Sequence, residues 1–269
     1  MAKPLAVITG ASSGIGEVYA RRLAPNHDLL LIARNRQRLE ALAAELTAKH
    51  GGTIAVMDAD LSESEEVKRV AARIVSEPDL SLLINNAGFG ARGPFWKADV
   101  EVLERMHRLH VNALVRLSHA ALAVMVPKNR GGLINLASVA AFARRPGSAC
   151  YAATKSWVAA FTEGLFVDLK KAGSDVVVQA LCPGYTYSSF HDVMGEDRGR
   201  IAPPSMWLSA ERVVDDSLAA LKRGELYVVP GWRYKLIVAL MKILPMRLRF
   251  RAAAGATPRA LKPQSGQPT

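Results

Sequence analysis

A glycine-rich segment directly follows the first apolar stretch of the chain and precedes its first helical segment. After Leu5–Ile8 come Thr-Gly-Ala-Ser-Ser-Gly-Ile-Gly at positions 9–16, and a helical pattern begins at about Glu17. Glycines at this point let the backbone turn sharply and approach a pyrophosphate closely, while the free N–H groups at the helix start attract the anion. The order strand, glycine-rich turn and helix therefore favours a dinucleotide-binding α/β fold.

Apolar segments of strand length alternate with helical segments along most of the chain, which is typical of a parallel sheet covered on both faces. We therefore predict a Rossmann-type, doubly wound parallel sheet of about seven strands, with helices on both faces, in a single α/β domain. The predicted strands are Leu5–Thr9, Asp28–Ala33, Thr53–Met57, Leu80–Asn85, Gly132–Ala137, Asp175–Leu181 and Glu225–Val229. The clearest predicted helices are Gln37–Lys49, Asp99–Met125, Ser148–Ala172 and Ala210–Arg223.

The end of the second predicted strand carries a cation where many dinucleotide-binding folds carry an acid. An acidic residue there would accept hydrogen bonds from the adenosine ribose and would repel a phosphate. Here Ala33 and Arg34 stand instead. A guanidinium can hold a 2′-phosphate through paired, charge-assisted hydrogen bonds, so the sequence predicts NADP(H) rather than NAD(H). The alternative is that Arg34, Arg36 and Arg38 form an ordinary solvated helix start.

Tyr151 and Lys155 are separated by one helical turn in a predicted helix and therefore lie on one face. A tyrosine free in water has a pKa near 10, but an ammonium within about 4–6 Å favours the phenolate and lowers that pKa. Ser138 stands thirteen residues before Tyr151, at the end of a predicted strand. A Tyr-x-x-x-Lys spacing is common by chance, and its weight here comes from the residues that accompany it.

As an ordered set these features resemble the classical short-chain dehydrogenase/reductases over about residues 5–230. The set comprises the glycine-rich turn, Asn85-Asn86-Ala87-Gly88 after the fourth strand, Asn112, Ser138, Tyr151 and Lys155. Each motif alone has an ordinary structural explanation. Ser138 could end a strand, Asn112 could be a polar helix residue, and Asp60 could cap the segment starting at Ser62. Their joint occurrence in this order favours one site.

The resemblance implies a role for each matching position. The pyrophosphate turn is matched by Thr9, Gly10, Ser12, Ser13, Gly14, Ile15 and Gly16, and the adenine pair by Asp60 and Leu61. The segment that braces the sheet and lines the cofactor is matched by Asn86, Ala87 and Gly88, and the segment that meets the nicotinamide carboxamide by Pro183, Gly184, Thr186 and Ser188. The family commonly has Thr at the last of these positions. Asn112 matches the position whose backbone carbonyl keeps a water in a proton relay to the lysine.

On this basis we expect an NADP(H)-dependent oxidoreductase that transfers hydride between nicotinamide and a carbonyl or secondary alcohol. Tyr151 would be the general acid/base, Ser138 would stabilise charge on the reacting oxygen, and Lys155 would bind the ribose hydroxyls and lower the Tyr151 pKa. The alternative from another class is a non-catalytic NADP(H)-binding sensor or scaffold of the same fold. A dehydratase or epimerase on a nucleotide-linked substrate would need a larger C-terminal substrate domain than this chain carries.

The segment between Gly184 and Leu208 is long enough to form a lid over the ligand-binding edge of the sheet. Its apolar and aromatic residues favour an apolar carbonyl substrate, or else serve as structural or oligomer contacts. They are Tyr185, Tyr187, Phe190, Met194, Met206 and Trp207. The family resemblance implies a homodimer or homotetramer built through the helices Asp99–Met125 and Ser148–Ala172.

Charge is concentrated at the C-terminal end. The net charge is +11, and the last 38 residues, from Trp232 to Thr269, contain eight basic residues and no Asp or Glu. The rest of the chain is nearly neutral, which argues against a nucleic-acid-binding body. We expect a dinucleotide-binding catalytic domain at residues 1–230, an apolar and basic helical extension at 231–252 and a disordered tail at 253–269.

The extension leaves two alternatives open. Trp232–Leu244 is broadly apolar, contains Lys235 and Lys242, and is followed by Pro245 and several arginines. Apolar surface with clustered cations is typical of peripheral contact with a membrane. The same composition fits a helix that is docked beside the substrate cleft or against a second subunit, with its basic end in water.

Cysteine usage and hydropathy favour a cytoplasmic protein. The two cysteines, Cys150 and Cys182, have neither metal-ligand nor redox spacing, and no metal site is expected. The N-terminal apolar run lacks the length and cleavage pattern of a secretory signal. We find no stretch that reaches the roughly 18 to 20 apolar residues needed to span a bilayer.

Overall fold

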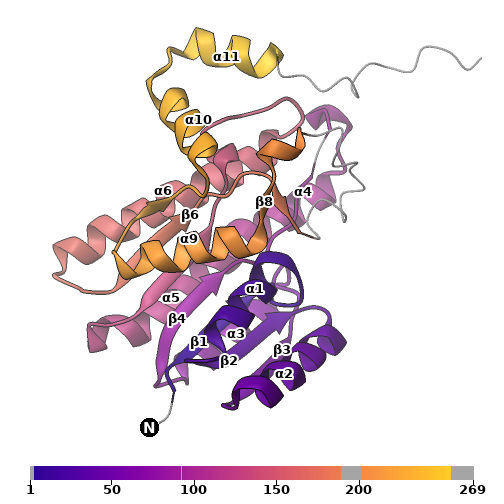
Figure 1. Ribbon diagram of the computed structural model, residues 1–269. Coiled ribbons are helices and arrows are strands. Elements are labelled where there is room, and N and C mark those ends of the chain that lie inside the picture. The colour runs from indigo at the N-terminus through magenta and orange to yellow at the C-terminus, as the bar shows by residue number, and fades with distance from the viewer. Residues whose placement is uncertain (1–2, 92, 189–201, 256–269) are drawn as a thin grey trace, which may run out of the picture.

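The computed structural model of the chain describes residues 3–91, 93–188 and 202–255. Its centre is a seven-stranded sheet in the order β3-β2-β1-β4-β5-β6-β9, and all neighbouring strands are parallel (Figure 1). The strands are β1 (Leu5–Thr9), β2 (Asp28–Ala33), β3 (Ile54–Asp58), β4 (Leu80–Asn85), β5 (Gly132–Leu136), β6 (Val177–Leu181) and β9 (Tyr227–Val228). The predicted doubly wound α/β fold is confirmed.

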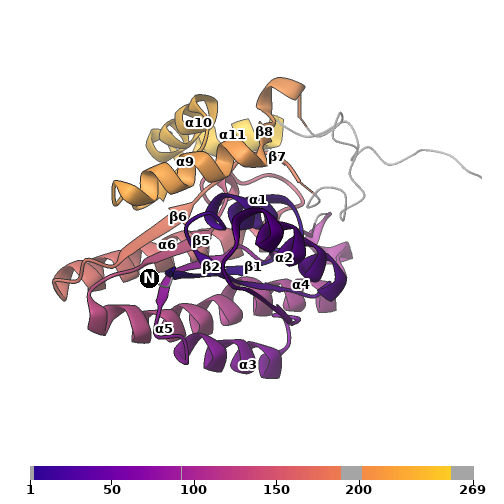
Figure 2. The same ribbon diagram turned by 60° about the horizontal axis from the view of Figure 1, so that its bottom comes forward.

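Helices cover both faces of the sheet (Figure 2). One face carries α1 (Gly14–Leu23), α2 (Arg36–His50) and α9 (Ala210–Lys222), and the other carries α3 (Ser64–Val75), α5 (Leu114–Met125) and α6 (Ala149–Lys171). Alternate side chains of each strand serve the two layers. In β1, Val7 packs in the cluster with α3 and α5, while Ile8 packs in the cluster with α1 and α2. Strands buried on both faces need continuous apolar sequence, which is why β1 and β2 were visible in the sequence.

The remaining elements lie at the edge of the sheet or beyond it. They are the short helices η1 (Phe95–Lys97), η3 (Val126–Lys128), η4 (Val139–Ala141) and η5 (Pro204–Met206), the helices α4 (Val100–His107), α10 (Trp232–Ile243) and α11 (Met246–Gly255), and the π-helical segment η2 (Arg108–Ala113). Two short strands, β7 (Thr186–Tyr187) and β8 (Leu208–Ser209), form a separate parallel pair. Figure 1 shows α10 and α11 at one end of the molecule, beyond the sheet.

Most strand boundaries agree with the sequence prediction, and the last strand differs most. β9 has only two residues, because only Ala180 and Leu181 of β6 pair with it. The predicted long helix 99–125 is helical from Val100 onward, but its middle part, η2, is π-helical, whereas α4 before it and α5 after it are α-helical. A π turn holds an extra residue, so it rotates the side chains that follow it, and such turns are frequent at functional sites.

Within the described residues, the stretch Val100–Lys128 is long and apolar enough to cross a membrane by length and composition. The sequence analysis did not identify it, because charged residues interrupt its apolar run. Half of its apolar window is buried inside the protein. Its second half, α5, packs against β4 and α3 as a core helix.

The carboxyl ends of the parallel strands meet at one edge of the sheet. The chain runs from β1 outward to β2 and β3, then returns to place β4 on the other side of β1. In open α/β sheets this reversal leaves a crevice between the two connections, where ligands bind. Thr9 ends β1 and Asn85 ends β4, so the glycine-rich turn and the Asn86-Ala87-Gly88 segment face each other across this crevice.

Candidate active site

A cavity of about 830 Å³ opens at this edge of the sheet. Most of the site residues named from the sequence line it. These are Gly10, Ser12, Ser13, Gly14, Ile15, Arg34, Asp60, Leu61, Asn86, Ala87, Gly88, Ser138, Tyr151, Lys155, Pro183, Gly184, Thr186 and Ser188. From the same set, Thr9, Gly16 and Asn112 do not line the cavity.

Thr9 and Gly16 shape the wall of the cavity from behind. The Thr9 hydroxyl accepts hydrogen bonds from the backbone N–H groups of Asn86 and Ala87, at 2.9 and 3.0 Å. The Asn86 amide donates to the Thr9 carbonyl at 2.9 Å, which ties the glycine-rich turn to the end of β4. A Cβ atom on Gly16 would lie 2.3 Å from the Gly10 carbonyl oxygen, so only glycine fits there. The turn is therefore fixed in shape without any ligand.

Cations gather where β2 ends. Arg34, Arg38 and Arg105 line the cavity there, together with the carboxylate of Asp60. The Asp60 carboxylate lies 4.0 Å from the Arg34 guanidinium and 3.9 Å from that of Arg105. Partial burial acts to raise the pKa of Asp60, but hydrogen bonds from Ser62 and the two guanidinium groups outweigh it and lower that pKa. The carboxylate is thus ionised and keeps two arginines at the cavity wall.

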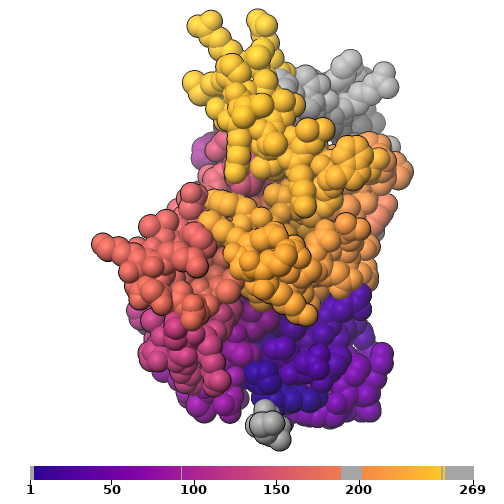
Figure 3. Space-filling view, turned by 60° about the vertical axis from the view of Figure 1, so that its left-hand side comes forward, coloured from indigo at the N-terminus to yellow at the C-terminus, as the bar shows by residue number. Residues whose placement is uncertain are grey.

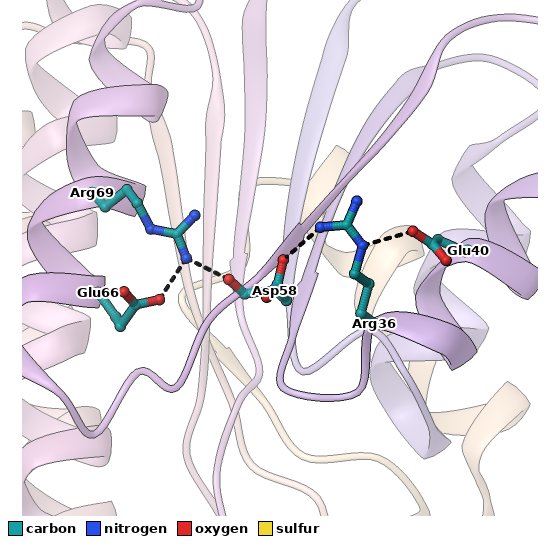
Figure 4. Close-up of polar contacts among 5 residues, drawn as sticks. All are labelled: Arg36, Glu40, Asp58, Glu66 and Arg69. Atoms are coloured by element: carbon teal, nitrogen blue, oxygen red, sulfur yellow. Dashed lines mark hydrogen bonds and ion pairs between the residues drawn. The ribbon is translucent and has the colours of Figure 1, made fainter.

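Arg36, which the sequence grouped with Arg34 and Arg38, points elsewhere. Its guanidinium bonds to Glu40 at 2.7 Å and to the Asp58 carboxylate at 3.1 Å (Figure 4). The Asp58 backbone carbonyl accepts a hydrogen bond from Arg69, which also pairs with Glu66. Arg36 does not line the cavity. The three arginines therefore divide into two at the cavity and one in a surface ion-pair chain.

Ser138, Tyr151 and Lys155 meet at the other end of the cavity. Ser138 follows β5 and caps η4, where its hydroxyl accepts a hydrogen bond from the Ala140 N–H at 3.1 Å. Helix α6 carries the other two, and the Lys155 Nζ lies 5.9 Å from the centroid of the Tyr151 ring. That ammonium donates to the Leu136 carbonyl at 2.7 Å. Burial lowers the pKa of Lys155 to about 8, so the lysine is still mainly charged at neutral pH.

A buried layer of polar side chains supports these residues from below. The Asn85 amide donates to the side-chain oxygen of Asn135 at 2.9 Å and to the Ser118 hydroxyl at 3.1 Å. The Asn135 amide in turn donates to the Thr162 hydroxyl at 3.0 Å, which bonds back to α6. This chain of hydrogen bonds ties the ends of β4 and β5 to α5 and α6. It fixes the helix that carries Tyr151 and Lys155 relative to the sheet.

The fourth catalytic residue named from the sequence, Asn112, lies in the π-helical segment η2. It is exposed and does not line the cavity. The role that the family resemblance implies belongs to its backbone carbonyl, so this role stays a prediction. His110, two residues earlier, is buried and lies near Lys155. The sequence analysis did not name this histidine, and the π turn that carries it could not be seen in the sequence.

His110 connects three parts of the site. Its Nε2 accepts a hydrogen bond from the Phe89 N–H at 3.3 Å, which leaves the proton on Nδ1 to be donated to the Thr154 hydroxyl at 2.9 Å. The Thr154 hydroxyl donates to the Tyr151 carbonyl at 2.9 Å. Burial first, and then the nearby Lys155 charge, hold the pKa of His110 well below its ordinary value, so the ring is neutral. A Cβ on Gly88 would lie 2.8 Å from Nε2, so this glycine admits the ring.

A second, much smaller cavity lies beside Lys155. Its volume is about 10 Å³, which is close to the space that one water molecule needs. Thr9, Asn85, His110 and Lys155 are among its lining residues, and Asn112 is not. A single water in this cavity would lie beside the lysine.

The mouth of the large cavity is formed by loops and by α10. Tyr185, Met206, Tyr234 and Ile237 line it, as does Arg145. Among the lid residues named from the sequence, Trp207 is buried and stacks near Tyr185 and Tyr187, while Phe190 and Met194 lie outside the described residues. The lining is therefore partly apolar, and Arg145 adds a cation that the sequence analysis did not anticipate. Its guanidinium lies over the Tyr185 ring at 5.3 Å.

Helix α10 is docked on the mouth through Tyr234. The Tyr234 hydroxyl donates to the Met206 carbonyl at 2.6 Å and accepts from the Tyr185 N–H at 2.9 Å. Its ring packs so closely on Gly184 that a Cβ there would lie 2.0 Å from ring atoms. Burial raises the pKa of Tyr234 to about 12. The sequence left open whether this helix docks on the protein. The face of α10 that carries Tyr234 is docked beside the cleft.

No group of three or more His, Cys, Asp or Glu side chains that could hold a metal occurs among the residues the structure describes.

Comparison with known proteins agrees with this geometry. The family model described as short chain dehydrogenase matches residues 4–199. A short-chain dehydrogenase from Sphingobium yanoikuyae, solved in complex with NADPH, is 34% identical with a TM-score of 0.81, over 90% of this chain and 97% of that one. A short-chain dehydrogenase/reductase from Burkholderia phymatum, solved with NAD, is 25% identical with a TM-score of 0.79, over 89% and 92%.

Among the curated relatives is a very-long-chain 3-oxoacyl-CoA reductase from Anas platyrhynchos, 29% identical over 185 residues. The alignment covers 67% of this chain and 59% of the reductase, so the chain spans less than two thirds of that relative. The structural neighbours, in contrast, are matched over nearly their whole length.

Proposed function

The chain belongs to the short chain dehydrogenase family, and on that premise we propose that it is an NADP(H)-dependent oxidoreductase acting on a carbonyl or secondary alcohol. The observation that carries the proposal is the convergence of Ser138, Tyr151 and Lys155 on the cavity that the glycine-rich turn also lines. The turn suits a pyrophosphate, and the three side chains suit proton transfer to an oxygen. One cleft thus contains both a site for the pyrophosphate and the side chains for proton transfer.

The residues present fit a phosphorylated dinucleotide. Gly10–Ile15 would hold the pyrophosphate against the start of α1, whose free N–H groups favour an anion. Arg34 and Arg38 would hold a 2′-phosphate, since both line the cavity at the end of β2, where no acidic residue follows the strand. The NADPH complex of the Sphingobium relative supports this choice, whereas the NAD complex of the Burkholderia relative keeps the alternative in view.

The nicotinamide, when bound, supplies or accepts the hydride, and the protein supplies position and protons. Ser138 would donate a hydrogen bond to the substrate oxygen and stabilise its developing negative charge. Tyr151 would give its hydroxyl proton to that oxygen in reduction and take it back in oxidation. The Lys155 ammonium, held by the Leu136 carbonyl, would stabilise the phenolate that reduction leaves behind.

The proton lost by Tyr151 must be replaced from solvent. We place a relay water in the small cavity of about 10 Å³ beside Lys155, whose polar lining provides the two to four partners that a buried water needs. His110 would act there as a positioning residue, because it lines this cavity and its hydrogen bonds hold both the Phe89 backbone and the Thr154 hydroxyl. The backbone carbonyl of Asn112 would keep the relay role that the family resemblance implies.

An apolar substrate fits the mouth of the cleft, where Met206, Ile237 and the Tyr185 ring lie. A homodimer or homotetramer also fits the surface. Val115 on α5 and Val167 on α6 are exposed apolar residues on the two helices through which we expect subunits to associate. We retain the cytoplasm as the expected location.

A screen of NADPH oxidation against a panel of apolar and polar ketones and aldehydes tests the proposal. We expect turnover with at least one apolar carbonyl and none when the carbonyl is omitted. The non-catalytic sensor would instead bind NADPH and leave it unoxidised with every member of the panel. That outcome would overturn the enzyme assignment while preserving the nucleotide site.

A further inference from the structure

We propose that the outer face of α10 binds an anionic lipid surface and brings the mouth of the active-site cleft to it. The helix is apolar nearly all round, and such a helix is ordinarily covered on every side. Here the protein covers only one side. Tyr234 and Val238 are buried, and Ile237 lines the cleft. The opposite side is exposed among the residues that the structure describes.

The uncovered side is a continuous apolar stripe, which we call the outer face. Trp232, Leu236, Leu240 and Ile243 recur every three to four residues and so share one face of the helix. Their exposed fractions are 67, 61, 44 and 78%. Met246, at the start of α11, continues the stripe at 63% exposure. Contiguous exposed apolar surface of this kind marks an interaction site, whereas single apolar side chains scattered over a surface do not.

The charges around the outer face select the partner. Every charged residue of α10 and α11 is basic, and the set is Arg233, Lys235, Lys242, Arg247, Arg249 and Arg251. Salt bridges with acidic side chains are common elsewhere on the described surface, for example between Arg22 and Asp215. Lys242 lies over the rings of Phe142 and Tyr227, and Glu225 interacts electrostatically with Lys235. Besides Lys242, the exposed cations of the two helices are Arg233, Lys235, Arg247 and Arg251. An apolar face with a mainly basic border complements a surface that is apolar beneath and negative at its boundary, which is an anionic bilayer.

The position of α10 gives this contact a consequence. The same helix lines the cleft through Tyr234 and Ile237, and Tyr234 fixes it to the loop at Tyr185. Figures 1 and 3 show α10 and α11 together at one end of the molecule, as its C-terminal part. A bilayer bound to the outer face would lie next to the cleft mouth. An apolar substrate could then pass from the lipid into the cleft without crossing bulk water.

Vesicle binding by the full-length chain tests the proposal. We expect co-sedimentation with vesicles of phosphatidylcholine and phosphatidylglycerol, little with phosphatidylcholine alone, and weaker binding at high ionic strength. The tryptophan emission should shift to shorter wavelength on binding, and Trp232→Phe should remove most of that shift. Equal recovery in the supernatant with both kinds of vesicle would overturn the proposal.

Two sets of variants separate the apolar and the charged contributions. Leu236→Glu with Ile243→Glu should abolish vesicle binding, whereas Val75→Glu, at an exposed apolar position of α3, should not. Arg233→Gln, Lys235→Gln and Arg247→Gln together should weaken binding roughly a hundredfold, or about fivefold per charge. The charge-matched control combines Arg130→Gln, Lys171→Gln and Lys222→Gln, which lie away from α10 and should leave binding nearly unchanged.

Two further measurements keep the result interpretable. NADPH oxidation with a water-soluble carbonyl should be the same in the Leu236→Glu, Ile243→Glu variant as in the wild type, because neither residue lines the cleft. Loss of vesicle binding is then separate from loss of the proposed activity. The molar mass by light scattering in the absence of lipid should also be unchanged. If the variant instead falls to a smaller oligomer and vesicle binding is absent in the wild type, the outer face joins copies of this chain.

Discussion

His110 lies edge-on to Tyr151, with ring centroids 5.9 Å apart and an angle of 71° between the ring planes. The histidine is buried and neutral, and its Nδ1–H reaches the Thr154 hydroxyl, which bonds to the Tyr151 carbonyl. The tyrosine is thus supported from the side of the sheet by a residue of the π-helical segment. This support has a measurable consequence.

His110→Ala should lower kcat by roughly 10- to 100-fold and leave the KM for NADPH nearly unchanged. The loss removes hydrogen bonds of about 1 to 3 kcal/mol that orient the site, and does not touch the pyrophosphate turn. His110→Asn, which can still accept and donate, should recover part of the activity.

Asn112→Ala provides the matched control on the same helix. Its side chain is exposed, so kcat should stay within about twofold of the wild type. The substitution leaves the backbone carbonyl of residue 112 in place and removes only the side chain. If Asn112→Ala were as damaging as His110→Ala, the loss in His110→Ala would reflect a disturbed η2 segment and not the missing imidazole.

Arg34→Asp should change the cofactor preference from NADPH towards NADH. The substitution removes a charge-assisted hydrogen bond and adds repulsion at the 2′-phosphate, so the ratio of kcat/KM values should fall at least 10- to 100-fold. Arg36→Gln is the control, because Arg36 is bonded to Glu40 and Asp58 instead of facing the cavity. An equal effect of both substitutions would mean that local charge, and not a specific contact, sets the preference.

Lys155→Met should stabilise the ligand-free protein at pH 7 while removing its activity. Burial lowers the pKa of Lys155 from 10.5 in the unfolded chain to about 8. Between pH 8 and pH 10.5 the unfolded state binds more protons than the folded state, so the free energy of unfolding rises with pH. Below about pH 8 the lysine is protonated in both states, and the full cost of burying its charge remains. That cost is at most about 3 kcal/mol, offset by about 1 kcal/mol for the lost hydrogen bond to the Leu136 carbonyl.

Urea unfolding of the wild type and Lys155→Met from pH 7 to pH 10 checks this. The wild type should gain stability over the alkaline part of the range, and the variant should lack that gain. Parallel pH dependences in the two proteins would show that the lysine is not a buried charge in the folded state.

The sequence predicted the sheet and the nucleotide end of the site well because these depend on local pattern. Residues 29–33 and 82–84 are continuous apolar runs, and the turn at residues 9–16 needs glycine for steric reasons that hold wherever it occurs. Ser138 and Tyr151 could be placed from their spacing to elements already predicted.

The parts that sequence reasoning missed depend on contacts between distant segments. His110 is buried in η2, a π-helical segment, and a helical periodicity cannot reveal where such a segment occurs. Tyr234 contacts Gly184, which lies fifty residues earlier in the chain. Its role in docking α10 therefore has no local sequence signal, apart from a glycine at position 184 that no predicted turn requires. Arg105 and Arg145 line the cleft from a helix and a loop, and no local pattern predicts either position.

Tyr151→Phe removes the hydroxyl that we propose as the proton donor and leaves the ring in place. NADPH binding by fluorescence titration and carbonyl reduction by NADPH oxidation should be measured on the same preparation. We expect the dissociation constant for NADPH to stay within a few fold of the wild type, while kcat falls by about 10²- to 10⁴-fold. Turnover close to that of the wild type in this variant would contradict the account.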